Sequence, residues 1–208
     1  VSKVYMVSLI DGKVLNKFGA VDAFKQREWV AWDSAPLVDA GTDTLIYPGE
    51  SGVLYTVKLN TKYDEAAGTL SIDPEQSVKI RYKNARAIEG GTAKYWLGME
   101  SSAVAWKNFL YVADNCGDLI CVDLNTMEIV WAADILDDSN GSPVLEIEAD
   151  GKGYIYISTS LHWTKKADNS GTIPFFKIDA TTGEKIWETP YNCYTVDGVS
   201  GGVQATAL

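Results

Sequence analysis

KIDATTGEKIW (177–187) and CVDLNTMEIVW (121–131) are two copies of one sequence pattern, and this pattern decides the fold of the chain. Each copy has an aspartate eight residues before a closing tryptophan; the pairs are Asp123 with Trp131 and Asp179 with Trp187. Shorter matches begin at Val57 (VKLNT) and at Leu9 (LIDGKVL). Because a pattern that recurs along a chain marks stacked structural units, the sequence predicts a repeat architecture.

The segments around these copies are short apolar runs rich in Val, Ile, Tyr and Leu, bounded by Gly, Asp, Asn and Ser. Such runs are typical of β-strands joined by tight turns; examples are TLIYPG from Thr44, FLYVADN from Phe109, DLICVDL from Asp118 and YIYIST from Tyr154. A second repeated element, a small residue followed by apolar ones, starts at Ser34, Ser102, Ser142 and Gln204. Each unit therefore holds four strands. An all-β chain with four-stranded units of about 40–50 residues is predicted to be a β-propeller, with one blade per unit.

Residues 177–187 resemble the eleven-residue tryptophan-docking motif of the quinoprotein, or PQQ-like, β-propeller repeat family, which runs roughly Ala-x-Asp-x-x-x-Gly-x-x-x-Trp. Asp179, Gly183 and Trp187 stand at its three key places, and Lys177 replaces the first residue. The resemblance extends over nearly the whole chain at the level of the repeats.

Residues 121–131 are a second copy, which carries Met127 in the place of the glycine. Each position of the pattern has a physical role. The glycine permits a tight turn between the third and fourth strands of a blade, and the aspartate accepts hydrogen bonds from the turn amides. The tryptophan can cover the neighbouring blade with a large apolar area. We therefore expect a structural docking role for Asp123, Trp131, Asp179, Gly183 and Trp187.

The predicted organisation is a single partial propeller of about four to five four-stranded antiparallel blades. Its parts are the end of a blade at 1–18, full blades at 33–83, 100–135 and 141–189, and the start of the next at 199–208. The resemblance implies a larger ring of seven or eight blades, completed by the remainder of the propeller or by a second copy of this chain. The alternative is a closed four-bladed ring. The chain begins at Val1 without a signal peptide, so we expect a piece of a longer protein.

Composition excludes several classes of protein. The chain has 208 residues, with 18 Lys and Arg against 28 Asp and Glu, and a net charge of −10. It lacks the basic stripe expected of a protein that binds nucleic acid or an anionic membrane. No apolar run approaches the roughly 18–20 residues of a membrane span. The single histidine, His162, excludes a zinc site built from several histidines. Three cysteines are too few for a disulfide framework, and we expect Cys116, Cys121 and Cys193 to be free and buried. The alternative is a disulfide between Cys116 and Cys121, which stand on either side of the turn at Gly117.

The resemblance also sets the functional alternatives. Quinoprotein dehydrogenases hold PQQ with a calcium ion, and many have two adjacent cysteines beside the cofactor. This chain has no Cys-Cys pair, and its acidic turns at 134–142 and 146–153 do not fit the calcium-loop spacing. We therefore predict no cofactor, no metal site and no catalytic residue. The leading hypothesis is a non-enzymatic binding or scaffold module of an extracellular or cell-envelope protein. The alternatives are half of a PQQ- and calcium-dependent dehydrogenase propeller, and a carbohydrate-binding propeller.

Two insertions between strands carry the candidate ligand-binding residues. The insertions are 161–172, with His162 and Trp163, and the segment around 88–99, with Tyr95 and Trp96. Loops on a rigid scaffold are frequent carriers of binding groups. The four residues therefore predict an aromatic platform for a glycan or protein ligand. The alternative is that the rings fold back and cover a blade, because Trp is usually largely buried.

Overall fold

The computed structural model describes residues 3–19, 31–59, 62–64, 66–67, 69–71, 78–80 and 98–206. Every secondary-structure element assigned in these residues is a β-strand. The strands are β1 (Val4–Val7), β2 (Val14–Phe18), β3 (Leu37–Asp39), β4 (Thr44–Gly49), β5 (Val53–Lys58), β6 (Lys62–Asp64), β7 (Thr69–Ser71), β8 (Val78–Ile80), β9 (Val104–Trp106), β10 (Phe109–Ala113), β11 (Asp118–Asp123), β12 (Glu128–Asp134), β13 (Val144–Ile147), β14 (Gly153–Ser158), β15 (Ser170–Asp179) and β16 (Lys185–Tyr194). A search of the described segments finds no helix long and apolar enough to cross a membrane.

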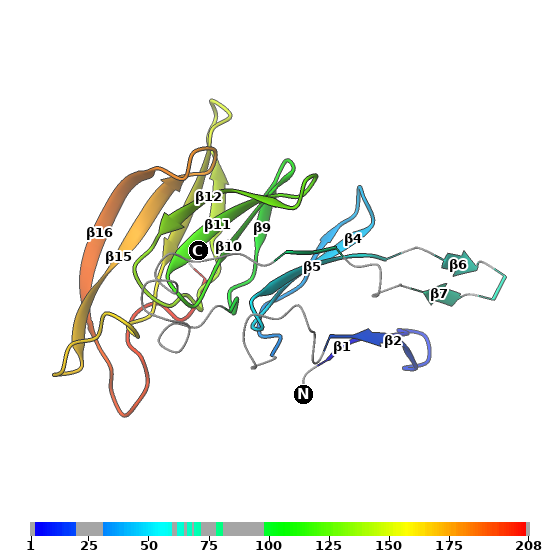
Figure 1. Ribbon diagram of the computed structural model, residues 1–208, viewed down its shortest axis with the longest axis horizontal. Helices are drawn as coiled ribbons and strands as arrows, with labels where there is room; N and C mark the ends of the chain where they lie inside the picture. The colour runs from blue at the N-terminus through cyan, green and yellow to red at the C-terminus, as the bar shows by residue number, and fades with distance from the viewer. Residues whose placement is uncertain are drawn as a thin grey trace.

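Three four-stranded antiparallel sheets form the body of the molecule and lie side by side in chain order (Figure 1). We call them blade 1 (β3, β4, β5 and β8), blade 2 (β9 to β12) and blade 3 (β13 to β16). Neighbouring strands follow one another along the chain, except that the two-stranded sheet β6–β7 is inserted between β5 and β8. A further two-stranded sheet, β1–β2, precedes blade 1. This is the architecture of a partial β-propeller, and the predicted all-β fold is confirmed.

Strand register identifies the equivalent residues of the three blades. Directly paired residues form one row across each sheet; the rows are Leu37, Ile46, Thr56 and Val78 in blade 1, Val104, Tyr111, Cys121 and Trp131 in blade 2, and Val144, Tyr156, Lys177 and Trp187 in blade 3. Paired residues on neighbouring strands share one face of a sheet. Trp131 and Trp187 therefore occupy equivalent positions, and Val78 stands at the same position in blade 1.

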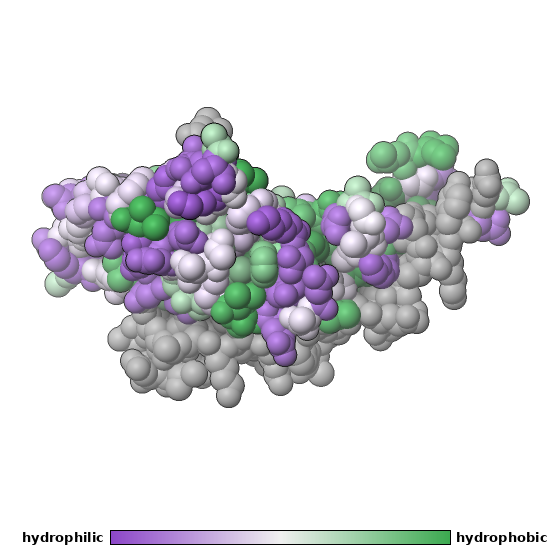
Figure 2. All heavy atoms as spheres, turned by 90° about the horizontal axis from the view of Figure 1, so that it is seen from above, coloured by the Kyte–Doolittle hydropathy of each residue, from purple (hydrophilic) through white to green (hydrophobic). Residues whose placement is uncertain are grey.

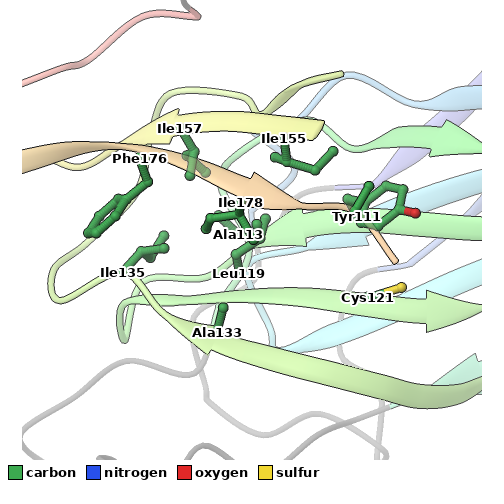
Figure 3. Packing of buried hydrophobic residues seen from close by; sticks show 11 residues of the cluster. Tyr111, Ala113, Leu119, Cys121, Ala133, Ile135, Ile155, Ile157, Phe176 and Ile178 are labelled. Atoms are coloured by element: carbon green, nitrogen blue, oxygen red, sulfur yellow. The ribbon is translucent and has the colours of Figure 1, made fainter. Parts of the chain in front are cut away.

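Apolar cores lie between adjacent sheets. Between blades 2 and 3, Tyr111, Ile178 and Phe176 belong to one cluster of buried side chains (Figure 3). Between blades 1 and 2, Ile46 packs in a cluster with Leu110. A third cluster joins the β1–β2 sheet to the opposite face of blade 1. Because strand side chains alternate between faces, each blade contributes one face to the core before it and the other to the core after it. Among the coloured residues on the face seen in Figure 2, hydrophilic side chains are mixed with separate apolar patches.

The turns between the third and fourth strands of blades 2 and 3 share one geometry. Asp179 Oδ1 accepts hydrogen bonds from the backbone N–H groups two and three residues later, at 2.7 and 2.9 Å, and Gly183 has a φ of +76°. Asp123 Oδ1 accepts from the N–H two residues later at 2.8 Å, and Met127 has a φ of +57°. A left-handed backbone costs a residue with a Cβ roughly 1–2 kcal/mol, which is why glycine suits this position.

A repeated hydrogen bond links the starts of the three blades. The backbone N–H of Ala35, two residues before β3, donates to Oγ of Ser102, two residues before β9, at 2.8 Å. The backbone N–H of Ser102 in turn donates to Oγ of Ser142, two residues before β13, at 3.0 Å. The small residues that precede each blade in the sequence therefore connect one blade to the next.

Candidate functional site

The motif tryptophan of blade 2 lies against the motif turn of blade 3. A Cβ placed on Gly183 would come within 2.7 Å of the Trp131 ring, so the indole rests directly on the glycine backbone. Trp106 of β9 meets Gly153 at the start of β14 in the same way, also at 2.7 Å. Any side chain on either glycine would occupy the volume that the indole fills. The structure thus brings Trp131 and Gly183 together across a blade boundary.

Trp187, the equivalent of Trp131, faces no further blade within the described residues. The residue is 40 % exposed. Its ring centroid lies 6.0 Å from that of Tyr156 and 6.2 Å from that of Phe175. We call the side of blade 3 that carries these three rings the open face. The side chain that docks at one blade boundary is therefore presented to solvent at the next.

Lys177 crosses the open face and organises its aromatic rings. Its Nζ lies 2.8 Å from Oε1 of Glu148 and 3.9 Å from the ring centroid of Tyr154. An ammonium group over an aromatic ring is attracted by the negative face of the ring. The open face therefore combines aromatic rings with the Lys177–Glu148 ion pair.

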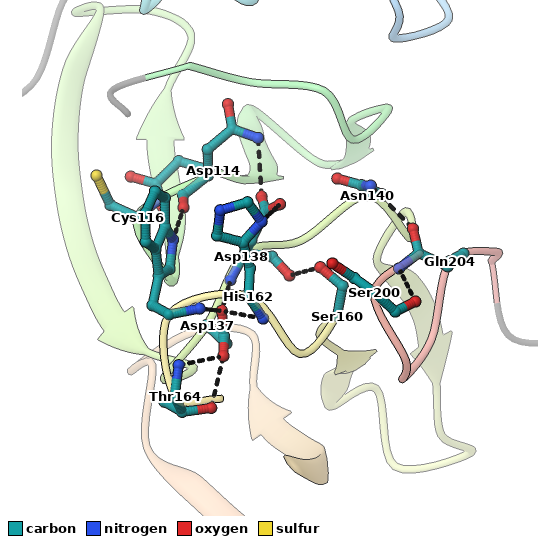
Figure 4. Close-up of polar contacts among 12 residues, drawn as sticks. Asp114, Cys116, Asp137, Asp138, Asn140, Ser160, His162, Thr164, Ser200 and Gln204 are labelled. Carbon is teal, nitrogen blue, oxygen red and sulfur yellow. Dashed lines mark hydrogen bonds and ion pairs between the residues drawn. The ribbon is translucent and has the colours of Figure 1, made fainter. Parts of the chain in front are cut away.

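The connection between β14 and β15 folds back onto blade 2 (Figure 4). The Asp137 carboxylate accepts hydrogen bonds from the backbone N–H groups of His162 (3.1 Å), Trp163 (2.7 Å) and Thr164 (2.9 Å), and from the Thr164 hydroxyl (2.6 Å). Trp163 Nε1 donates to the carbonyl of Asn115 at 2.5 Å. The imidazole and indole rings of this loop lie 4.2 Å apart and are partly buried. Both rings are thus held against blade 2, and their role as a ligand platform stays a prediction.

The other half of the predicted platform, Tyr95 and Trp96, lies outside the described residues. The described residues therefore contain only the His162 and Trp163 half of the predicted platform.

Asp138 is a buried carboxyl group beside the same loop. Its Oδ1 accepts a hydrogen bond from Nδ2 of Asn115 at 2.8 Å, and its Oδ2 lies 3.9 Å from Nδ1 of His162 (Figure 4). Burial raises the pKa of Asp138 to about 7, the hydrogen bond from Asn115 opposes this rise, and the charges of Glu100 and Asp137 add to it. A carboxyl group with such a pKa, next to an imidazole, can take up or release a proton near neutral pH.

Within the described residues, one group of three carboxylates brings its oxygen atoms within 4.8 Å of one another, namely Asp33, Glu50 and Glu100. Asp33 precedes β3, Glu50 lies in the turn between β4 and β5, and Glu100 precedes β9. Carboxylate oxygens are ligands that calcium prefers, but acidic side chains also gather without an ion, so the group alone assigns no metal. Sequence spacing could not reveal it, because three separate segments supply the residues.

The three cysteines are buried, and none of them forms a disulfide. Burial raises the pKa of the Cys121 thiol to about 12, and the charge of Asp123 adds to this rise. Burial also raises the pKa of Cys193. Because the thiolate is the reactive form, these raised pKa values disfavour a nucleophilic role for Cys121 and Cys193 at neutral pH.

No protein-family model matches the sequence, and no curated protein matches it as a relative. Solved structures do match. BamB from Moraxella catarrhalis aligns with a TM-score of 0.55 and 15 % identity over 90 % of this chain and 46 % of its own. The hydrazine synthase of Kuenenia stuttgartiensis aligns with a TM-score of 0.51 and 15 % identity over 91 % of this chain and 43 % of its own.

At this level of identity the likeness concerns the fold alone, and it is a likeness to β-propellers. The chain spans slightly less than half the length of these two proteins. The described part of the chain is therefore similar to a portion of a larger propeller.

Proposed function

We propose that this chain is a non-catalytic β-propeller module that acts as a scaffold, and that its open face binds a further four-stranded blade. The observation that carries the proposal is the contrast between two equivalent tryptophans. Trp131 is covered by the turn of the next blade, whereas Trp187 is 40 % exposed on a face of aromatic rings. An exposed cluster of large apolar side chains is typical of a protein–protein contact surface.

The contact between blades 2 and 3 indicates what kind of turn should cover Trp187. Trp131 needs Gly183 beneath it because the ring occupies the space of a Cβ. The blade that covers Trp187 should likewise present a turn with glycine in a left-handed conformation. The remainder of a propeller and a second copy of this chain could both supply such a turn, and the experiment below separates them. An extracellular or cell-envelope location is part of this proposal and rests on the family resemblance.

The burial of Trp187 can be measured by hydroxyl-radical footprinting with mass spectrometry. The isolated chain at low concentration should show faster oxidation of Trp187 than of Trp131. Protection of Trp187 that grows with chain concentration, together with a dimer mass in light scattering, would identify a second copy. Protection only in a longer protein that contains this chain would identify the remainder of the propeller.

Trp163 serves as the internal control, since its indole is held by Asn115 within this chain and its oxidation should not change. Equal oxidation of Trp187 in the isolated chain at all concentrations and in the longer protein would overturn the proposal.

A further inference from the structure

The two-stranded sheet β1–β2 has the strand register of the outer half of a blade. The pairing of β1 with β2 shifts directly after Met6, as the pairing shifts after Cys121 in blade 2 and after Lys177 in blade 3. Met6 is therefore the equivalent of Cys121 and Lys177. By this register β1 and β2 correspond to the third and fourth strands of blades 2 and 3.

The turn between β1 and β2 also matches the turns between the third and fourth strands. The backbone N–H of Gly12 donates to the carbonyl of Ser8, four residues earlier, at 2.9 Å. The N–H of Gly183 donates to the carbonyl of Asp179 over the same interval and at the same distance. Gly12 is left-handed as well, with a φ of +73°. Gly12 is thus the equivalent of Gly183, on which the Trp131 indole rests.

One side of β1–β2 is exposed where the same side of blades 2 and 3 is covered by the preceding blade. In these blades, alternate residues around the third strand lie in or against the shared core; they are Ile120, Val122 and Leu124 in blade 2 and Phe176, Ile178 and Ala180 in blade 3. Their equivalents are Tyr5, which is 55 % exposed, Val7, which is 46 % exposed, and Leu9, which is fully exposed. We call the side with Tyr5, Val7 and Leu9 the bare face. The opposite side, with Met6 and Phe18, packs against blade 1.

The bare face and the open face are the two halves of one kind of boundary. The open face carries the docking indole of Trp187 and no turn covers it within the described residues. The bare face carries the docking turn, and a Cβ on Gly12 would meet nothing within 4 Å, so no indole rests there. The two faces belong to opposite ends of the row of sheets (Figure 1). A contact between them therefore joins two copies of this chain head to tail.

We infer that the bare face of one copy of this chain receives the open face of a second copy, with Trp187 of one resting on Gly12 of the other. The inference rests on the proposed function and names the partner and its docking turn. A second copy is the occupant because each copy carries both halves, and joining them covers the apolar side chains of both faces. The Lys177 ammonium is already paired with Glu148 at 2.8 Å, so the contact leaves neither charge without a partner.

Sedimentation velocity at increasing chain concentration tests this contact. The wild-type chain should show a mass that grows with concentration up to about 1 mM. Trp187→Ala should weaken self-association by about tenfold or more, because it removes the indole of the contact. Gly12→Asn should weaken it to a similar extent, because the new side chain fills the space in which the indole rests.

The matched control for Gly12→Asn is Gly198→Asn. Asparagine tolerates a left-handed backbone, so both changes add a side chain with little strain. Gly198 has a φ of +81° and, like Gly12, has nothing within 4 Å of a Cβ position. Gly198→Asn should associate as the wild type does.

A mixture of the two interface variants distinguishes a head-to-tail contact from one in which two copies of the same face meet. Gly12→Asn keeps Trp187, and Trp187→Ala keeps Gly12, so the mixture holds one intact contact. It should form a one-to-one complex that neither variant forms alone. Leu9→Asp is the second variant of the bare face, and it replaces Gly12→Asn in the mixture if that change disturbs the turn. Leu9 is fully exposed, so folding of the monomer does not depend on its burial.

Three results would overturn the inference. They are no self-association of the wild type at about 1 mM, self-association unchanged in both Gly12→Asn and Leu9→Asp, and no complex in the mixture. Footprinting tells this failure apart from failure of the proposed function. Protection of Trp187 in a longer protein that contains this chain would still support the proposed function, whereas oxidation of Trp187 that is equal under all conditions would overturn both.

Discussion

The boundary between blades 2 and 3 and the boundary between blades 1 and 2 use the same backbone and are filled differently. At the first, two indoles lie on two glycines. At the second, Val78 and Asp39 face Met127 and a cavity remains. Both boundaries keep a central apolar core and the same serine hydrogen bond. The comparison teaches that a blade boundary can keep its apolar core and its serine hydrogen bond while the side chains beside them differ.

The largest expected effect contrasts the docked tryptophan with the open one. Trp131→Ala should lower the free energy of unfolding by about 3–5 kcal/mol, because it empties a packed boundary. Trp187→Ala should lower it by less than about 1 kcal/mol in the monomer, because Trp187 is 40 % exposed and no neighbouring blade covers it within the described residues. Urea unfolding followed by far-ultraviolet circular dichroism measures both. Equal losses would show that docking at the outer edge does not stabilise the blade pair.

The next effect concerns the buried carboxyl group near the boundary of blades 2 and 3. The folded-state pKa of Asp138, about 7, lies above its ordinary value of 3.8. The group therefore contributes stability that is full below about pH 4 and is lost as the pH rises through 7. Asp138→Asn keeps an acceptor for Asn115 and cannot ionise. It should match the wild type at pH 4 and exceed its free energy of unfolding at pH 8 by a few kcal/mol, about 4 at most.

The measurement for Asp138→Asn is urea unfolding at several pH values between 4 and 8. Glu188→Gln on the exposed strand β16 is the control and should show no such difference. A stability difference between Asp138→Asn and the wild type that does not vary with pH would contradict the assigned pKa.

A smaller effect on stability is expected from replacing glycines with alanine, and two glycines together distinguish backbone strain from contact with the Trp131 indole. Gly183 and Gly151 have similar left-handed φ values, +76° and +83°, but only Gly183 has the Trp131 ring within 2.7 Å of a Cβ position, whereas Gly151 has nothing within 4 Å. Gly151→Ala should cost about 1–2 kcal/mol from strain alone. Gly183→Ala should cost a further 1–3 kcal/mol, roughly, because the methyl group overlaps the ring. Thermal and urea unfolding of both variants test this, and equal costs would refute direct docking on the turn.

The smallest expected effect is common to the two boundaries. Ser102→Ala and Ser142→Ala each remove one acceptor from a backbone N–H of the preceding blade, at 2.8 and 3.0 Å. Each change should lower the free energy of unfolding by about 1 kcal/mol. Similar losses would place the difference between the boundaries in their outer side chains. A loss at only one boundary would mean that the inner links differ as well.

The fold could be predicted because its signals are local. The aspartate and the left-handed residue of each turn act on backbone atoms two to four residues away, and strands show their alternation within a few residues. Trp131 and Trp187 were placed by their spacing from those turns. The same reasoning did not identify Val78, the residue of blade 1 that is equivalent to these two tryptophans. Thr56 and Val78 pair directly, but the β6–β7 hairpin lies between them along the chain, so no fixed spacing marks Val78 as their equivalent.

The candidate sites were less accessible to sequence reasoning. His162 and Trp163 were singled out by their residue types, but the carboxylate that holds their backbone belongs to Asp137, 25 residues away for His162. The Asp33, Glu50 and Glu100 group, likewise, is assembled from three segments. Contacts of this kind depend on which turns meet when the blades stack, and periodicity along the chain carries no information about that.

The sequence alone determined the strands, the turns and the repeat that stacks them, since these depend on hydrogen bonds and side-chain alternation among near neighbours. The tertiary structure decided which boundary is filled and which is hollow, which tryptophan is covered, and which carboxyl group becomes hard to ionise. These properties depend on volume and solvent exclusion, and both exist only after distant segments have come together.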